Sequence, residues 1–215
     1  MELSLYQIDA FTDDLFLGNP ACVVPLTKML PDTLLLKIAQ ENAVAETAFF
    51  LIKDQKIFLR WFTPEVEMDL CGHATLATAH CLKTILKYSG NIFQFETLSG
   101  ILVVEFKDGL YHLNFPSRMP KKIKLPSLLQ QSINISPVYV FKARDYVLIY
   151  DSEYDIKNIT INRVPFDQLS LGAGGVIVTS EGDSCDFVSR FFTPKASILE
   201  DPVTGSAHCS LIPFW

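Results

Sequence analysis

The chain has 215 residues, of which 49% are apolar and 20% are charged, and its formal net charge is −6. This length allows one large domain or two small ones, with enough apolar residues for a packed core. Nucleic-acid binding normally needs a strong basic face. The main basic cluster, residues 121–124, is better explained as a solvated linker edge, so nucleic acid is excluded as a partner.

The sequence shows no membrane or secretory signal. No stretch approaches the roughly 20 consecutive apolar residues of a membrane helix, and residues 1–11 lack the basic and then apolar pattern of a secretory signal. The five cysteines are an odd number without a Cys-x-x-Cys pair. This pattern favours a reducing compartment and gives no zinc signature, so we expect a cytoplasmic protein without a membrane partner.

The periodicity of apolar residues predicts mainly strands in the first part of the chain. In chain order we expect a strand over residues 3–11, a Gly-Asn-Pro loop over 18–20, a strand over 21–26, a helix over 31–42, and a hairpin of strands over 46–52 and 57–62. Glu46 stands at the entrance of the first hairpin strand.

Residues 60–80 read as a strand, a loop and a helix that begins at Gly72. Between Gly72 and Tyr88 apolar positions cover nearly the whole helix circumference, which is typical of a helix buried among other elements. Three strands are predicted to follow, over residues 93–97, 101–106 and 111–115.

A stretch rich in Pro and Lys, residues 116–126, marks the expected domain boundary. We expect a first domain over 1–116 and a second over 117–215, with the second truncated within or after its central helix. Its predicted elements are strands over 138–141, 146–150, 156–163, 176–179 and 186–192, and a helix that begins at Gly205.

The chain repeats one motif, because RWFTP at residues 60–64 returns as RFFTP at 190–194. Each copy precedes a glycine-led apolar helix, and residues 46–63 are echoed by 174–193. The echo has no acid that corresponds to Glu46. The sequence therefore predicts two similar halves, of which only the first carries this carboxylate.

The two helix starts, at Gly72 and Gly205, are candidate anion sites. Unpaired backbone N–H groups at a helix N-terminus can hold a carboxylate or a developing enolate. The alternative is that both glycines are ordinary loop residues before helices.

Four side chains are candidates for the chemistry. Glu46 would work as a general acid–base if its strand entrance is partly desolvated, or it is a surface residue at a strand end. His73 could carry a proton or simply pack. Asp201 could orient a partner or form a turn before Pro202. Ser206 could donate to a substrate or cap its helix.

Cys71 and Cys209 would suit two-base racemisation if the two thiols faced one substrate. However, Cys71 precedes its helix while Cys209 lies about one turn inside the other, so the two are not equivalent in the repeat. Buried cysteines often act only as small apolar groups. The glycine run at residues 172–175 precedes a strand, which is the wrong context for a dinucleotide site.

Taken together, these motifs resemble the PhzF-like (phenazine biosynthesis-like) isomerase family. The resemblance spans the chain and rests on the following segments: QIDAF at 7–11, GNP at 18–20, ET at 46–47, FTP at 62–64, CGHAT at 71–75 and EDPVTGSAH at 200–208. It implies an α+β fold of two similar domains. In each domain a strongly curved, mostly antiparallel sheet wraps around a central buried helix, as in diaminopimelate epimerase.

The resemblance also implies a function. It implies a catalytic Glu46 assisted by His73 and Asp201, and substrate binding by Asn19, Gly72, Gly205 and Ser206, in a cleft between the two domains. It further implies no metal or cofactor and a homodimer, and the candidate anion sites at the two helix starts favour a small carboxylate substrate. Family members continue some tens of residues beyond the last helix predicted here.

We therefore expect a cofactor-independent isomerase that moves a carbon-bound proton, with Glu46 as general acid–base. Two alternatives remain open: an epimerase that uses Cys71 and Cys209, and a non-catalytic protein that binds a small carboxylate.

Overall fold

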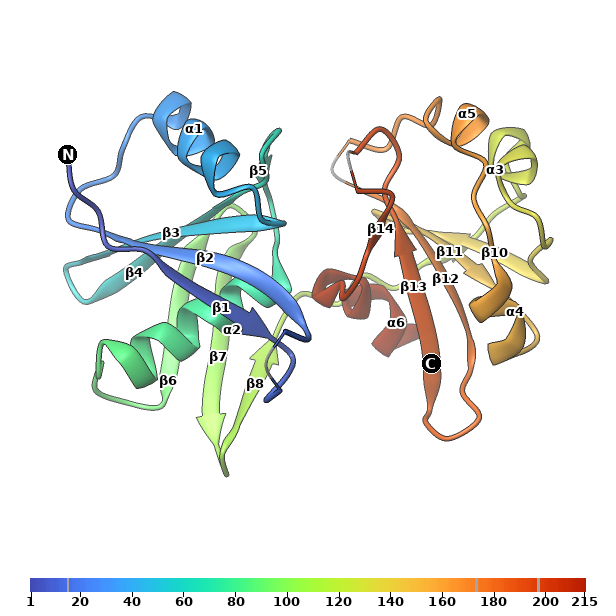
Figure 1. The fold of residues 1–215 in the computed structure, drawn as a ribbon. Helices are drawn as coiled ribbons and strands as arrows, with labels where there is room; N and C mark the ends of the chain where they lie inside the picture. Colours follow the sequence, from blue (N-terminus) through green and yellow to red (C-terminus); the bar gives the residue numbers. More distant parts are fainter. Residues whose placement is uncertain (15, 173, 197) are drawn as a thin grey trace. The chain divides into compact units, whose positions relative to one another are not determined.

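The structure is a computed structural model that describes residues 1–14, 16–172, 174–196 and 198–215. It separates into two compact units, Met1–Phe115 and Pro116–Trp215 (Figure 1). The glycine run at 172–175 includes residue 173, which lies outside the described residues.

The first unit is one curled sheet around a helix. Its strand order is β1-β2-β3-β4-β6-β7-β8, with β5 paired to β4. The β2–β3 and β4–β6 pairs are parallel and the others are antiparallel. The strands are β1 (Tyr6–Ala10), β2 (Asn19–Leu26), β3 (Glu46–Lys53), β4 (Lys56–Phe62), β5 (Glu67–Met68), β6 (Ile92–Thr97), β7 (Gly100–Lys107) and β8 (Leu110–Asn114).

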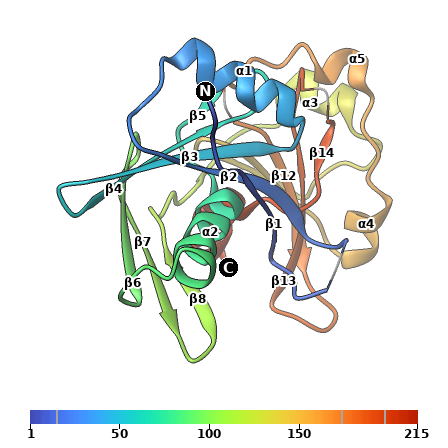
Figure 2. The ribbon, with the colours of Figure 1, turned by 60° about the vertical axis from the view of Figure 1, so that its left-hand side comes forward.

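Helix α2 (Gly72–His80) lies inside the curve of this sheet and continues as a short π-helix, η1 (Cys81–Ile85) (Figure 2). Seven of its nine residues are buried. Small side chains let the strands approach, and the threonine hydroxyls donate to the helix backbone, from Thr75 to the Cys71 carbonyl at 2.5 Å and from Thr78 to the Ala74 carbonyl at 2.7 Å. A second helix, α1 (Asp32–Asn42), begins after Pro31.

The second unit is built on a six-stranded sheet of order β14-β13-β12-β11-β10-β9. The β11–β12 pair is parallel and the others are antiparallel. The strands are β9 (Lys121–Lys122), β10 (Tyr139–Lys142), β11 (Tyr146–Ile149), β12 (Val176–Glu181), β13 (Phe187–Phe192) and β14 (Glu200–Asp201).

Helices cover both faces of this second sheet. A 3-10 turn, η2 (Gly205–Ala207), leads into α6 (His208–Phe214), whose Leu211 packs with Val147, Ile177 and Phe191. Leu148, Val178 and Phe192 pack in a separate apolar cluster with residues of the short helices. These helices are α3 (Ser127–Ser132), α4 (Glu153–Asn158) and α5 (Arg163–Phe166).

The α+β class and the curled sheets around buried helices are confirmed, but the predicted strand over residues 156–163 is wrong. This stretch is the end of α4, a connection and the start of α5. The Ser152 hydroxyl accepts from the Asp155 N–H and the Asn162 side chain accepts from the Val164 N–H. These side chains accept hydrogen bonds from backbone N–H groups at the starts of α4 and α5. The spacing of apolar residues did not reveal these two helix starts.

The repeated RxFTP motif forms the same clamp in both units. Arg60 donates to both carboxylate oxygens of Glu67 at 2.7 Å, and Arg190 donates to those of Glu200 at 2.7 and 2.8 Å. The two guanidinium groups lie 5.1 and 4.9 Å from the ring centroids of the phenylalanines at positions 62 and 192. The motif therefore fastens the strand that leads into each helix.

The register of the two sheets makes Gly175 the counterpart of Glu46. Thr47 pairs with Phe62 in the first unit, and Val176 pairs with Phe192 in the second. A Cβ atom at Gly175 would lie 2.4 Å from the Phe191 ring and 2.7 Å from the Phe192 carbonyl oxygen. The second unit therefore excludes any side chain where the first unit carries its carboxylate.

Gly175→Ala is expected to lower the free energy of unfolding of the second unit by about 1–3 kcal/mol, because the ring and the backbone must move to admit the new methyl group. Urea unfolding followed by Trp215 fluorescence in a Trp61→Phe background measures this change. Glu181→Ala, at the exposed end of β12, the strand that follows Gly175, is the control and should change stability little. Equal stability of the two variants would contradict the assigned clash.

Candidate active site

Glu46, Cys71 and His73 meet in the first unit, where β3 begins beside the first turn of α2. His73 Nε2 lies 3.3 Å from Glu46 Oε2, and His73 Nδ1 lies 3.6 Å from Cys71 Sγ. One donor atom of each residue lies within 4.8 Å of the other two. The three side chains form a thiol–imidazole–carboxylate group, which we call the 46–71–73 cluster.

The local backbone explains why these side chains converge. Cys71 is the N-cap of α2 with extended dihedral angles, φ −139° and ψ 117°, so it stands beside the first turn and next to His73. Glu46 is the first residue of β3 and pairs with Ala21 of β2. Because α2 packs against both strands, its first turn meets the strand entrance.

His73 is buried, with only 4% of its side chain exposed. Burial lowers the pKa of His73 to about 4, and a hydrogen bond with the Pro20 backbone acts in the opposite direction. The ring is therefore neutral at pH 7, and its contact with Glu46 is not an ion pair. Within the described residues Nε2 also makes no aligned hydrogen bond, since the carboxylate is close but off the required direction.

The lowered pKa of His73 predicts a pH dependence of stability. An unfolded histidine takes up a proton near pH 6.5, whereas His73 in the folded chain does so near pH 4. The unfolded state therefore binds more protons between these values, and stability is full above about pH 6.5 and falls toward pH 4. The loss is about 3 kcal/mol at about 1.4 kcal/mol per pH unit.

Urea unfolding of the wild type and of His73→Gln at pH 7.5, 6.0 and 4.5 checks this expectation. The difference in unfolding free energy between the two proteins should shrink as the pH falls, because glutamine does not titrate. A difference that is independent of pH would contradict a neutral, buried His73.

The predicted binding residues of the first unit flank the cluster. Gly72 separates Cys71 from His73 at the start of α2. Asn19 opens β2 and is fully buried, one residue before Pro20, whose backbone bonds with His73. The structure therefore places Asn19, Gly72 and His73 around the entrance of β3, where Glu46 lies.

The second unit gathers Asp201, Gly205 and Ser206 around η2. Asp201 accepts a hydrogen bond from the Thr204 hydroxyl at 2.5 Å, so it braces the loop that leads into the 3-10 turn. Ser206 is buried and its hydroxyl oxygen accepts from Arg144 Nη2 at 3.0 Å. Its hydroxyl proton is thereby directed away from the guanidinium.

Arg144 and Asp145 were missed by the sequence reasoning. Asp145 is buried, lies 3.3 Å from Arg144 Nε, and accepts from the Gly175 N–H at 2.8 Å. The second unit therefore has a buried carboxylate beside Gly175, the counterpart of Glu46. The positive charge of Arg144 balances the charge of this carboxylate. No local signal reveals the contacts of this pair with the rest of the unit, because Asp145 and Gly175 are 30 residues apart and Arg144 and Ser206 are 62 apart.

The two candidate cysteines occupy different positions. Cys71 is the N-cap residue of α2, whereas the N-cap residue of η2 is Thr204. Cys209 lies inside α6, and its backbone carbonyl accepts from the Arg118 N–H at 2.7 Å. Burial raises the pKa of the Cys209 thiol, although Arg118 and Arg144 act in the opposite direction.

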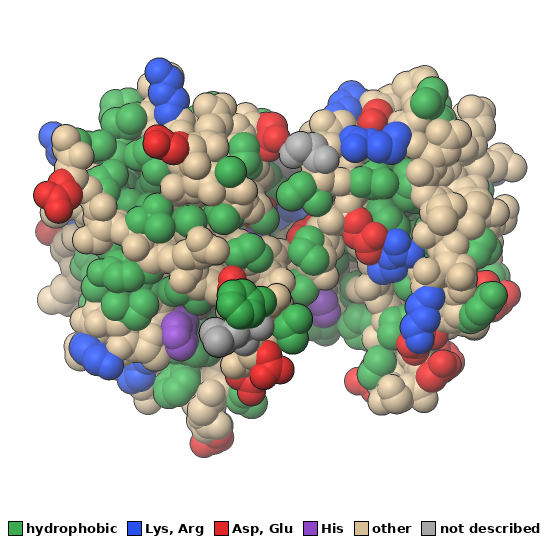
Figure 3. Space-filling view, in the orientation of Figure 1, with side chains coloured by type: hydrophobic (Ala, Val, Ile, Leu, Met, Phe, Trp, Pro, Cys, Tyr) green, Lys and Arg blue, Asp and Glu red, His purple; other side chains and the backbone are tan. Residues whose placement is uncertain are grey.

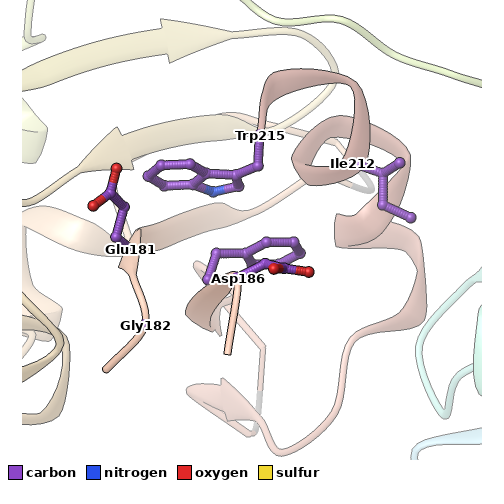
Figure 4. Close-up of a pocket in the computed structure, with 6 residues that line it drawn as sticks. Glu181, Gly182, Asp186, Ile212 and Trp215 are labelled. Atoms are coloured by element: carbon purple, nitrogen blue, oxygen red, sulfur yellow. The ribbon is translucent and has the colours of Figure 1, made fainter. Parts of the chain in front are cut away.

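A cavity of about 520 Å³ lies at the end of α6, lined by residues that include Glu181, Asp186, Ile212 and Trp215 (Figure 4). Trp215 covers part of the apolar helix end, since its indole stacks on Phe187 with ring centroids 6.2 Å apart and its N–H donates to the Thr179 hydroxyl. None of the predicted site residues lines this cavity. A smaller cavity, of about 220 Å³, includes Asp201 and Thr204 in its lining.

Acidic and basic side chains are mixed on the surface, as their scatter along the sequence indicates. On the face shown in Figure 3, basic side chains stand singly or in small groups among acidic and apolar ones. Lys121 and Lys122 are exposed. Of the helices that the structure describes, none is long and apolar enough to cross a bilayer.

The two sheet-around-helix units define the fold class of the chain. A hydroxyproline epimerase from Agrobacterium vitis has the same fold, with a TM-score of 0.60 at 11% identity, over 99% of this chain and 76% of that one. A PhzF-family structure from Enterococcus faecalis is much more similar. Its TM-score is 0.90 at 43% identity, over 100% of this chain and 82% of that one.

Residues 8–215 match the PhzC-PhzF family, described as phenazine biosynthesis-like protein. An uncharacterised isomerase of Pseudomonas aeruginosa is 44% identical over 216 residues, and one of Halalkalibacterium halodurans is 42% identical over 220 residues. In both comparisons the match covers 100% of this chain and 82% of the relative. The chain belongs to the phenazine biosynthesis-like family, as the motifs predicted, and its enzyme class is isomerase.

Proposed function

We propose that this isomerase moves a carbon-bound proton on a small carboxylate substrate, with Glu46 as the general acid–base. The observation that carries the proposal is the 3.3 Å contact between Glu46 and His73 at the entrance of β3. Glu46 is partly exposed, at 16% of its side chain, so a ligand can reach it, while the buried His73 ring packs beside it.

The chemistry of the neighbours supports a basic Glu46. A cationic partner would favour the charged carboxylate and weaken it as a base. His73 is neutral at pH 7 and lacks this effect, so it adds polarity beside Glu46 without charge. A carboxylate in such a place can remove a proton from carbon and return it to another carbon, which needs no second base.

In this proposal Asp201 and Ser206 complete the site from the second unit. Because Ser206 accepts from Arg144, its own hydroxyl proton is available to a substrate oxygen. Asp201 keeps the η2 loop in place through Thr204 and assists proton movement. The backbone N–H groups at Gly72 and Gly205, with Asn19, bind the substrate carboxylate or enolate. The proposed interdomain cleft requires both groups of residues to act on the same substrate.

The experiment is an exchange screen with the whole chain. Cyclic and unsaturated carboxylic acids are incubated with the protein in D₂O, and deuterium at carbon is followed by ¹H NMR. The proposal predicts exchange in a carboxylate substrate and none in the matching amide, which lacks the anionic group. Exchange that does not depend on the carboxylate would contradict the proposed substrate class.

The two alternatives have less support. A two-thiol epimerase would need Cys71 and Cys209 as equivalent bases, but Thr204 occupies the position that corresponds to Cys71. Exchange that is lost equally in Cys71→Ser and Cys209→Ser would favour it. A non-catalytic binding protein would bind carboxylates in the screen and exchange none of them.

The cytoplasmic location and the homodimer stay predictions drawn from the cysteine pattern and the family resemblance. Light scattering of the purified protein tests the second of these, and a monomeric mass at micromolar concentration would contradict it.

A further inference from the structure

We propose that Glu46, Cys71 and His73 also form a zinc-binding site, and that zinc bound there inhibits the enzyme. The site concerns an inhibitory ion and not a cofactor of the reaction. The inhibition rests on the proposed function of Glu46, whereas the binding itself does not.

The donor set of the 46–71–73 cluster suits zinc. A thiolate, an imidazole and a carboxylate are the three kinds of ligand that Zn²⁺ takes in proteins, while Mg²⁺ and Ca²⁺ require oxygen ligands. One donor atom of each side chain lies within 4.8 Å of the others. In the described part of the chain no other group of three Cys, His, Asp or Glu side chains converges as closely.

The Glu46–His73 distance matches that of two zinc ligands, whereas Cys71 lies near the other ring nitrogen of His73. Two ligands at zinc–oxygen and zinc–nitrogen bond lengths are about 3.3 Å apart at a tetrahedral angle, and a sulfur and a nitrogen are about 3.5 Å apart. Glu46 Oε2 lies 3.3 Å from His73 Nε2, and Cys71 Sγ lies 3.6 Å from His73 Nδ1. Because one ion takes one ring nitrogen, Cys71 must turn from Nδ1 toward an ion at Nε2.

An independent observation points to a ligand at this place. His73 Nε2 is buried and, within the described residues, makes no aligned hydrogen bond, although a buried polar atom normally has one. An ion bound to Nε2 would give this nitrogen a partner, and the Glu46 carboxylate already lies close enough to bind the same ion. The Cys71 thiol releases its proton to solvent as the zinc–sulfur bond forms.

Binding would remove the proposed base from the reaction. A carboxylate bound to zinc shares its negative charge with the ion, so it is a much weaker base toward a carbon-bound proton. With three protein ligands, the fourth position of a tetrahedral ion stays open to water. The expected result is a protein that binds one Zn²⁺ and loses its exchange activity until a chelator removes the ion.

Co²⁺ serves as the spectroscopic probe, in a Cys185→Ser background that removes the exposed thiol. The proposal predicts one Co²⁺ per chain, a near-ultraviolet thiolate-to-cobalt charge-transfer band, and displacement of that band by Zn²⁺. Cys71→Ala should abolish the band. His73→Gln and Glu46→Gln should weaken zinc binding by more than the roughly 100-fold that loss of an outer-shell partner costs.

Cys81→Ala is the matched control, because Cys81 is a buried thiol that continues from the same helix, and it should keep the band. Absence of the band, or a band that survives in Cys71→Ala, would overturn the site. Zinc binding without inhibition of exchange would leave the site standing and overturn the proposed role of Glu46. The two failures are therefore distinguishable.

Discussion

Replacing Glu46 with glutamine is expected to lower kcat by about 10²–10⁴-fold, the usual contribution of a general acid–base. Glutamine keeps the size of the side chain and its contact with His73, but it cannot take up a proton. KM should change much less, because the substrate carboxylate is held by other groups. Steady-state kinetics with the substrate found by the exchange screen measure both constants.

Glu96→Gln is the matched control for this variant. Glu96 lies in β6 of the same unit and forms an ion pair with Lys56 at 3.2 Å, so its loss changes a surface charge and no proposed catalytic group. Its kcat should stay close to that of the wild type. Equal losses in the two variants would point to a general effect of charge and would remove Glu46 from the mechanism.

Replacing Asp145 with alanine is expected to cost about 3 kcal/mol of stability in the second unit. Asp145 is buried, with 1% of its side chain exposed, and lies against the Arg144 guanidinium. Its loss leaves a largely buried arginine without its carboxylate and the Gly175 N–H without its acceptor. Removal of one partner from a buried ion pair typically costs 3–5 kcal/mol, and the partial exposure of Arg144 favours the lower end.

Asp145→Asn separates the two causes, because its amide oxygen can still accept from the Gly175 N–H while the charge is lost. Urea unfolding followed by Trp215 fluorescence, in the Trp61→Phe background, should place this variant between the wild type and Asp145→Ala. If Asp145→Ala were as stable as the wild type, the pair would have no structural role.

The fold was largely predictable because both helix and strand periods are strong in this chain. The all-round apolar pattern from Gly72 predicted a buried helix, and α2 is buried on nearly every side. The short helices α4 and α5 were not predictable in the same way. Their six and four residues are too few to show a period, and their ends depend on single capping side chains.

The candidate site was predictable residue by residue but not as a set of contacts. Glu46 and His73 stood out because one opens an apolar strand and the other a buried helix. Their 3.3 Å contact comes from the packing of α2 against β3, which sequence spacing does not encode. The hydrogen bond from Arg144 to Ser206 was still harder to predict, because these two residues are 62 positions apart in the sequence.

The repeat now has a structural explanation that the sequence left open. The RxFTP copies clamp the strands that precede the two helices, and the chemistry differs between the units. Glu46 lies beside the neutral His73 ring in the 46–71–73 cluster, whereas Asp145 beside Gly175 lies against the Arg144 guanidinium. The geometry thus supports one carboxylate base in the first unit and a neutralised carboxylate in the second.

The most direct test of a carboxylate-based proton transfer is mass-spectrometric measurement of deuterium incorporation into substrate carbon in D₂O. It compares the wild type with Glu46→Gln and Cys209→Ala. We predict that the wild type and Cys209→Ala incorporate deuterium at similar rates and that Glu46→Gln incorporates almost none. Incorporation by Glu46→Gln at the wild-type rate would contradict the central claim, because the proton would then be moved by another group.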